Sequence, residues 1–181
     1  MDDATPPLTR RELRRRREAA GGFSVRANPM PQGPVTILMV CTGNICRSAL
    51  ADVVMSHRLA DLGVKVHSAG TFALVGHGMP REARELALAR GARPEDVDRH
   101  AGRYLYEPLI AESDLVLAMT GEHRTFAVQA VPVHVTRTFT IREFAWLSSG
   151  LRDEDIRAVA ASAGEDPRAG SARSSRSSSS R

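Results

Sequence analysis

Two adjoining stretches of the chain decide the fold, Val35-Thr36-Ile37-Leu38-Met39-Val40 and Cys41-Thr42-Gly43-Asn44-Ile45-Cys46-Arg47-Ser48. The first is an apolar run between Pro34 and the cysteine, which predicts a buried strand. The second leads into a helical pattern, so it predicts a loop at which unpaired backbone N–H groups and the positive end of a helix dipole converge. The pair therefore predicts a strand, an oxyanion-binding loop and a helix in succession.

The residue types in this loop point to nucleophilic chemistry on a phosphate. Cys41 shares the positive field of the loop, which favours the thiolate, and a thiolate is a ready nucleophile. Arg47 follows six positions later and can hold two phosphate oxygens with its planar guanidinium. Gly43 lets the backbone come close to the ligand, and Ser48 can donate a hydrogen bond to the sulfur. The other interpretation is a cysteine that merely lies in a strand-to-helix turn.

The loop resembles that of the low-molecular-weight protein tyrosine phosphatases, which reads C-T-G-N-x-C-R-S in many bacterial members. Three further segments occur in the family's order and at about its spacing, so that the resemblance covers residues 35–147: Ser68-Ala69-Gly70-Thr71, His100-Ala101-Gly102-Arg103 and Ser113-Asp114-Leu115-Val116-Leu117-Ala118-Met119-Thr120. The resemblance implies that Cys41 attacks a phosphotyrosine-containing protein or an aryl phosphate, and that water hydrolyses the resulting phosphocysteine. It implies no cofactor and no metal, because Arg47 and the backbone amides carry the charge.

The resemblance also implies roles for the other loop residues. The phosphate-binding set is Thr42, Gly43, Asn44, Ile45, Cys46, Arg47 and Ser48. Asn44 and Ser48 support the loop, and His100 hydrogen-bonds it from beneath. Ile45 and Leu74 line the pocket, and because the family's phosphoarginine branch tends to carry Thr at the place of Ile45, isoleucine favours an aryl phosphate. Cys46 is either a small residue packed in the loop or a partner that forms a reversible disulfide with Cys41 under oxidation.

The expected general acid is the part of the sequence that departs most from the family's motif. The family supplies it from an Asp-Pro-aromatic segment on a late loop, because a phenolate leaves poorly unless it is protonated. Here the corresponding dipeptide is Asp166-Pro167, and Arg168 follows in place of an aromatic residue. Asp166 is therefore the candidate acid. The alternative is a chain that lacks the acid and acts only on activated aryl phosphates, acts slowly, or binds phosphorylated partners.

Apolar runs and helical patterns alternate along the chain. Strands are expected at 35–40, 64–68, 114–119 and 131–135, and helices at 48–62, 81–90, 122–129 and 141–147. This alternation predicts an α/β fold with a doubly wound, four-stranded parallel sheet and helices on both faces, of the phosphotyrosine phosphatase I type. The cysteine loop then lies at the carboxyl end of a central strand, where such folds bind ligands.

Composition divides the chain into three parts. Residues 1–33 read as a basic, disordered arm and linker, 34–150 as the phosphatase domain, and 151–181 as a helical or disordered Arg/Ser-rich tail in which the family's last helix is missing. The chain has 24 Arg and one Lys. The net charge of the whole chain is +4, of which residues 1–26 contribute +3 and residues 168–181 contribute +4, so residues 27–167 carry a net charge of −3. The expected domain therefore has no broad basic surface that would support specific nucleic-acid binding.

The two cysteines, Cys41 and Cys46, both lie in the loop, so there is no disulfide framework and a reducing, cytoplasmic location is expected. No apolar run approaches the roughly 18 residues of a membrane span. The five histidines other than His100 show no metal-ligand spacing; they are His57, His67, His77, His123 and His134. Two alternatives remain open: an arsenate reductase of the same fold, and a catalytically impaired phosphotyrosine-binding module.

Overall fold

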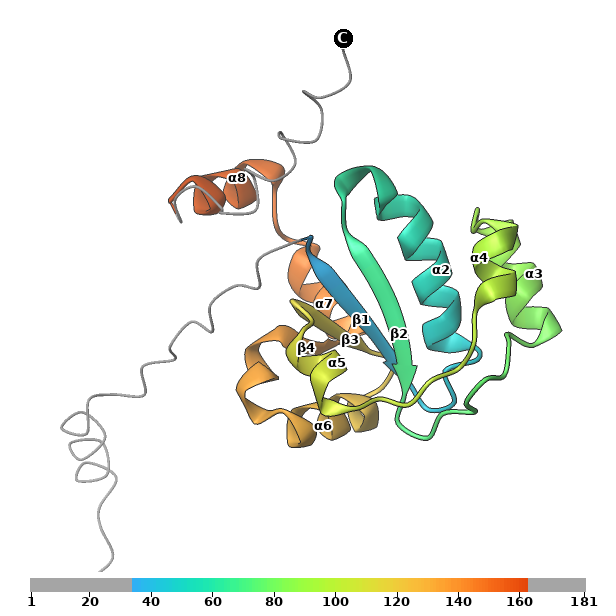
Figure 1. Ribbon diagram of the computed structural model, residues 1–181. Coiled ribbons are helices and arrows are strands. Elements are labelled where there is room, and N and C mark those ends of the chain that lie inside the picture. Colours follow the sequence, from blue (N-terminus) through green and yellow to red (C-terminus); the bar gives the residue numbers. More distant parts are fainter. Residues whose placement is uncertain (1–33, 163–181) are drawn as a thin grey trace, which may run out of the picture. The chain divides into compact units, whose positions relative to one another are not determined.

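The computed structural model describes residues 34–162. The expected N-terminal arm, Asp166 and the Arg/Ser tail beyond residue 162 lie outside the described residues. The sheet has four parallel strands in the order β2-β1-β3-β4, as Figure 1 shows. The strands are β1 (Thr36–Cys41), β2 (Lys65–Gly70), β3 (Leu115–Ala118) and β4 (Thr138–Thr140). The expected parallel sheet is thus confirmed.

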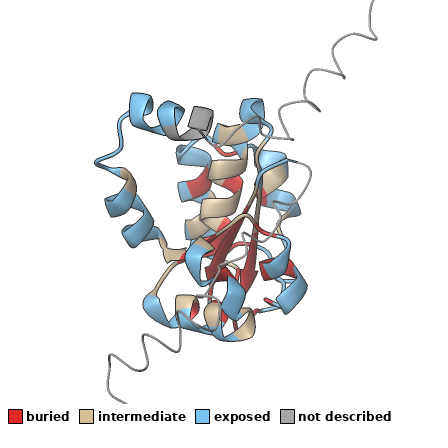
Figure 2. Cartoon of the chain, turned by 90° about the vertical axis from the view of Figure 1, so that its left-hand side faces the viewer, coloured by how far each residue is buried: buried red, intermediate tan, exposed pale blue. Residues whose placement is uncertain are grey.

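Strand β1 is the centre of the core. Leu38, Met39 and Val40 have no exposed surface, and alternate side chains point to opposite faces of the sheet. Figure 2 shows that the buried residues concentrate on the strands and on the helix sides that face them. Because β1 has a strand on each side and helices above and below, its end at Cys41 is held rigidly.

Helices cover both faces of the sheet. On one face Leu38 and Val40 pack with residues of α5 (Glu107–Ala111) and α6 (Gly121–Ala130). On the other, Met39 packs with residues of α2 (Arg47–Leu59), and Phe139 of β4 lies against Phe144 of α7 (Ile141–Ser148). The expected doubly wound arrangement is therefore present.

Helix α2 joins the sheet to a second layer of helices. It follows the cysteine loop and continues into a short 3₁₀ helix, η1 (Ala60–Leu62), which Gly63 ends in the left-handed conformation at φ 67°. Its buried Ala49 and Val53 pack with residues of α3 (Arg81–Ala89) and α4 (Pro94–Arg99). The segment between β2 and α3 must therefore pass close to the start of α2.

The expected fourth strand at 131–135 was wrong. Val131, Val133 and Val135 alternate as in a strand, but the segment forms a 3₁₀ helix, η2 (Pro132–Arg137), and β4 follows it. Proline at the first position suits a helical turn and cannot donate to a ladder. The expected helix at 141–147 is confirmed as α7, which a capping box begins: Thr140 and Glu143 bond each other's backbone N–H groups.

The last described element is α8 (Asp153–Ser162), whose side chains at positions 153–158 are exposed. Helices α4 and α5 were not predicted, because each is shorter than two turns and gives no clear periodicity. Across the described part of the chain, no helix has both the length and the apolar character needed to cross a membrane.

Candidate active site

The cysteine loop connects the end of β1 to the start of α2. Cys41 is the last residue of β1 and is 2% exposed, whereas Thr42, Cys46 and Arg47 are exposed. The first helical bond runs from the Leu50 N–H to the Cys46 carbonyl at 2.8 Å. The loop therefore lies at the carboxyl edge of the sheet, beside the N-terminus of α2, as the sequence predicts.

Two groups of the loop point at the Cys41 sulfur. The Ser48 hydroxyl lies 2.8 Å from Sγ, and the Asn44 backbone N–H donates to Sγ over 3.3 Å. Both contacts are buried. A hydroxyl and a backbone N–H can both donate to sulfur, so the loop offers the nucleophile two hydrogen bonds.

Asn44 is the residue on which the loop conformation depends. It has no exposed surface and is, among the described residues, the one non-glycine residue with a positive φ, 54°. Its side-chain Nδ2 donates to Ser48 Oγ over 3.0 Å, and its Oδ1 accepts from the Arg103 backbone N–H at the same distance. Its carbonyl accepts from His100 Nε2 at 2.7 Å. The structure thus brings together the three residues expected to support the loop, Asn44, Ser48 and His100.

The segment after β2 is fastened to the cysteine loop. The backbone N–H groups of Phe72 and Leu74 donate to the carbonyls of Thr42 and Gly43, each at 3.0 Å. The close approach requires glycine at position 70, because a Cβ there would collide with the Thr42 carbonyl and lie 3.0 Å from the Asn44 nitrogen.

At Gly43, by contrast, a Cβ would meet no backbone within 4 Å, and its neighbours would be the side chains of Ile45 and Leu74 at 3.7 and 4.0 Å. Close packing therefore requires glycine at position 70 and also at position 102, where a Cβ would collide with the Leu74 carbonyl. Sequence reasoning quoted both glycines in motifs without giving either a role. Ile45 and Leu74 lie beside each other at the loop, where they were expected to line the pocket.

Arg47 is exposed, and its guanidinium donates to the Thr42 hydroxyl over 3.3 Å. That hydroxyl also lies 2.9 Å from His123 Nε2, and the other ring nitrogen lies 2.7 Å from the Thr120 hydroxyl. Sequence reasoning missed His123 because it tested the histidines only for metal-ligand spacing. The available signal was position: His123 follows the end of β3, the strand next to β1, at the same edge of the sheet as the loop.

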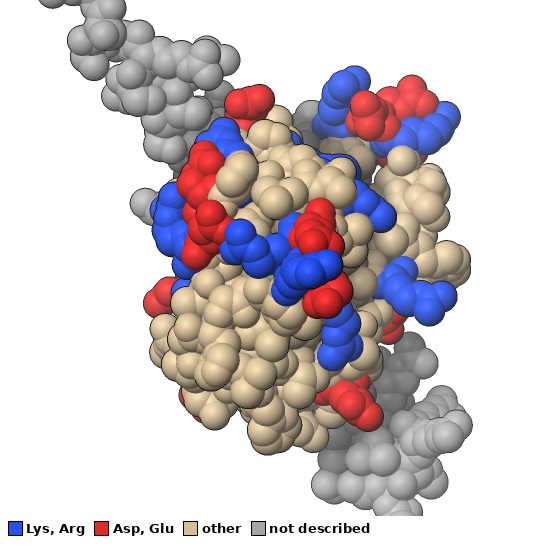
Figure 3. Space-filling view, turned by 90° about the vertical axis from the view of Figure 1, so that its right-hand side faces the viewer, with Lys and Arg blue, Asp and Glu red and all other residues tan. Residues whose placement is uncertain are grey.

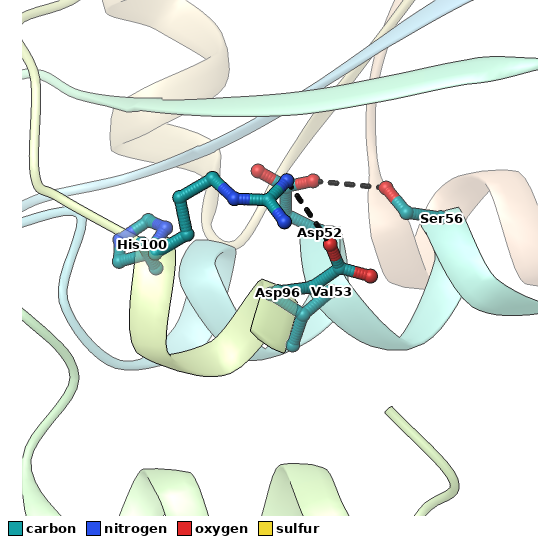
Figure 4. A pocket seen from close by; sticks show the side chains of 6 residues that line it. Asp52, Val53, Ser56, Asp96 and His100 are labelled. Atoms are coloured by element: carbon teal, nitrogen blue, oxygen red, sulfur yellow. Dashed lines mark hydrogen bonds and ion pairs between the residues drawn. The ribbon is translucent and has the colours of Figure 1, made fainter. Parts of the chain in front are cut away.

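A cavity of about 200 Å³ is lined by residues of α2 and α4 and by His100. Figure 4 shows its lining side chains. Asp52, Ser56 and His100 are among its lining residues. Burial raises the pKa of the Asp52 carboxyl, against hydrogen bonds from Ser68 (2.7 Å) and Ser56 (3.2 Å) that lower it. The described residues contain no group of three or more His, Cys, Asp or Glu side chains that could hold a metal ion.

Cys46 does not pack into the loop, because it is exposed, so that interpretation was wrong. Both cysteines are free thiols. The disulfide between Cys41 and Cys46, and the role of Asp166 as the acid, stay predictions.

The model of one protein family matches most of the chain. It is described as low molecular weight phosphotyrosine protein phosphatase, and it matches residues 36–170, a range that extends past residue 150 and includes Asp166. Because this match covers far more than half of the chain, the protein belongs to the low molecular weight phosphotyrosine protein phosphatase family.

Individual relatives agree with the family assignment. The low molecular weight protein-tyrosine-phosphatase Etp of Escherichia coli is 43% identical over 49% of this chain and 56% of its own length. A protein-arginine-phosphatase of Geobacillus stearothermophilus is 34% identical over 61% of this chain and 72% of its own. The matched part of this chain thus spans little more than half of the Escherichia coli protein.

Solved structures of the family share the fold. The low molecular weight protein tyrosine phosphatase of T. tengcongensis has a TM-score of 0.56 and 36% identity, over 65% of this chain and 78% of its own. The YwlE arginine phosphatase of Geobacillus stearothermophilus also has a TM-score of 0.56, with 32% identity over 69% of this chain and 82% of its own. The doubly wound α/β fold is therefore that of this family.

Proposed function

We propose that this chain is a protein tyrosine phosphatase that hydrolyses phosphotyrosine monoesters through a phosphocysteine intermediate. The observation that carries the proposal is the buried Cys41 sulfur, which receives the Asn44 N–H and lies 2.8 Å from the Ser48 hydroxyl at the base of an oxyanion-binding loop. The family match supports the same reaction. We expect no metal or cofactor in it.

In the first step the Cys41 thiolate attacks the phosphorus, an S–P bond forms, and the bond from phosphorus to the tyrosine oxygen breaks. The electron pair of that bond goes to the phenol oxygen, which takes a proton from the general acid. Arg47 and the loop amides hold the three remaining phosphate oxygens as negative charge spreads over them. We assign the acid to Asp166, whose Asp-Pro dipeptide falls inside the family match.

In the second step a water oxygen attacks the phosphocysteine, the S–P bond breaks, and the electron pair returns to sulfur as a thiolate. Water gives its proton to the carboxylate that Asp166 became in the first step, so inorganic phosphate leaves and the enzyme is restored. Ser48 stabilises the departing thiolate by donating to it.

The substrate atom that carries the phosphoryl group is, in this proposal, the tyrosine oxygen and not an arginine nitrogen. Some relatives are named protein-arginine-phosphatases, so both substrates require testing. Ile45, an apolar residue beside Leu74 at the loop, suits an aryl ring. The adjoining segment, residues 71–80, has no charged residue, and its Phe72 is 70% exposed. Figure 3, which views the molecule from the right-hand side of Figure 1, shows a broad area without Lys, Arg, Asp or Glu at the lower left.

We further propose that residues 34–150 form the core of the catalytic domain and that the protein works in the reducing cytoplasm, where Cys41 and Cys46 stay free thiols. The relatives are named phosphatases, which favours hydrolysis over the arsenate-reductase and binding-module alternatives.

The test is phosphate release from matched peptides that carry phosphotyrosine or phosphoarginine, with reductant and chelator present. Multiple turnovers on phosphotyrosine, a much slower rate on phosphoarginine, and none for the Cys41→Ser variant are expected. Turnover on phosphoarginine alone would overturn the substrate, and equal turnover by Cys41→Ser would overturn the mechanism.

A further inference from the structure

Arg47 is connected to helix α6 by a chain of side-chain hydrogen bonds. The guanidinium donates to Thr42 Oγ1 over 3.3 Å, Thr42 Oγ1 lies 2.9 Å from His123 Nε2, and His123 Nδ1 lies 2.7 Å from Thr120 Oγ1. Thr42 and His123 are 81 residues apart in the sequence. The chain of bonds therefore ties the exposed arginine of the loop to the fixed end of β3 and the start of α6.

His123 is suited to the middle of such a chain. It is 5% exposed, so its ring has little freedom to turn. Burial, and then the nearby Arg47, lower the pKa of the His123 ring. A neutral imidazole has one N–H, so the ring donates one of its two hydrogen bonds and accepts the other. Thr42 Oγ1 keeps a lone pair for the Arg47 guanidinium in either tautomer.

We propose that His123 is a positioning residue: through the Thr42 hydroxyl it holds the Arg47 guanidinium over the phosphate loop. His123 has no recorded hydrogen bond to the Cys41 sulfur, and the loop backbone does not depend on it, because Phe72 and Leu74 already bond the carbonyls of Thr42 and Gly43. Substitution of His123 should therefore change the position of the Arg47 guanidinium and leave the loop backbone in place. The proposal rests on the assignment of Arg47 as the phosphate clamp.

The test measures the affinity of the purified full chain for inorganic phosphate by titration calorimetry, which needs no turnover. His123→Phe keeps the ring volume and removes both hydrogen bonds, and His123→Ala removes the ring. Each should weaken phosphate binding about tenfold, the size expected when one hydrogen bond that orders a charged group is lost. Thermal unfolding confirms that each variant is folded.

A double-mutant cycle separates positioning from a general structural effect. In an Arg47→Lys background, His123→Phe should change phosphate affinity by less than about twofold, because lysine lacks the planar guanidinium that His123 positions. His134→Ala is the matched control: His134 is 2% exposed but lies in η2 and has no recorded hydrogen bond to the loop, so phosphate affinity should stay unchanged.

Three results would overturn the proposal. The first is an unchanged phosphate affinity in folded His123→Phe. The second is an equal loss of affinity from His123→Phe in the wild-type and Arg47→Lys backgrounds, and the third is the same loss of affinity in His134→Ala. The outcome is independent of the proposed reaction, because a wild type that binds phosphate without hydrolysing any phosphoester would refute the function and leave the positioning role supported by these three comparisons.

Discussion

The Ser48 hydroxyl lies 2.8 Å from the Cys41 sulfur, within a buried contact between the end of β1 and the first turn of α2. The same hydroxyl accepts a hydrogen bond from the Asn44 side chain at 3.0 Å. Because a thiolate has no proton to donate, the hydroxyl is the donor in this contact when Cys41 acts as a thiolate. Nucleophile, hydroxyl and loop conformation are therefore coupled in one small network.

Ser48→Ala removes the hydrogen bond to the sulfur. A hydrogen bond to a charged group contributes about 1.5–3 kcal/mol, so kcat should fall roughly ten- to a hundredfold while phosphate affinity stays nearly constant. Because the departing thiolate needs this bond most in the second step, stopped-flow assays should show a clearer burst of product than in the wild type. An unchanged kcat would show that the contact does not act in the reaction.

Asn44→Ala should destabilise the fold by about 2–4 kcal/mol, because it combines a strained left-handed residue with lost buried hydrogen bonds. Asn44→Gly loses the same side chain but accepts the φ of 54° without strain. Chemical denaturation should place the glycine variant roughly 1 kcal/mol above the alanine variant. Equal stabilities would contradict the strain at this position.

Gly70→Ala tests the packing between the β2 loop and the cysteine loop. The new Cβ would collide with the Thr42 carbonyl and lie 3.0 Å from the Asn44 nitrogen, so the loop must shift. Overpacking of this kind costs about 1–3 kcal/mol, and activity should fall by at least about tenfold. Gly121→Ala is the control, since nothing lies within 4 Å of its Cβ position. If both variants keep wild-type activity, the close approach is unimportant.

His67 should make folding sensitive to mild acid. Burial, followed by Arg103, lowers the pKa of His67 to about 4 from 6.5. Between about pH 6.5 and about pH 4 the unfolded chain binds a proton at His67 and the folded chain does not, so stability is lost as the pH falls through this range. Above it His67 is neutral in both states and does not change the stability. His67→Gln should remove this part of the slope in urea titrations. A slope identical to that of the wild type would show that other groups cause it.

Asp166→Asn should affect substrates according to their leaving groups. Phosphotyrosine, whose phenolate leaves poorly, should lose about 10²–10⁴ in kcat, the usual contribution of a general acid. p-Nitrophenyl phosphate, whose leaving group needs little protonation, should lose much less. Glu165→Gln is a neighbouring control that removes a charge without touching the Asp-Pro dipeptide. If both substrates are hydrolysed at the wild-type rate, another group is the acid.

The strand, loop and helix at 35–62 could be predicted because their signals are local. An apolar run, a loop that contains cysteine, glycine and arginine, and a helical repeat follow each other without interruption. Parallel topology then required the loop to lie at the carboxyl edge, beside the end of β3. The positions of Asn44, Ser48 and His100 around one another followed from the family resemblance.

The remaining features depend on contacts that no local pattern contains. The fourth strand was placed at 131–135 because valines alternate there, whereas the three residues of β4 pair with β3 only once η2 has turned the chain. Gly70 and His123 act on Thr42 from 28 and 81 positions away, and their importance appears only when the strands are side by side.

The most direct test of the central claim is to trap the covalent intermediate. The wild-type chain is mixed with excess phosphotyrosine peptide, quenched rapidly and digested, and the cysteine-loop peptide is analysed by mass spectrometry. The account predicts one phosphoryl group on Cys41, absent from Cys41→Ala and still present in Cys46→Ala. Hydrolysis that proceeds with no phosphoryl group on Cys41, or with one on Cys46, would contradict it.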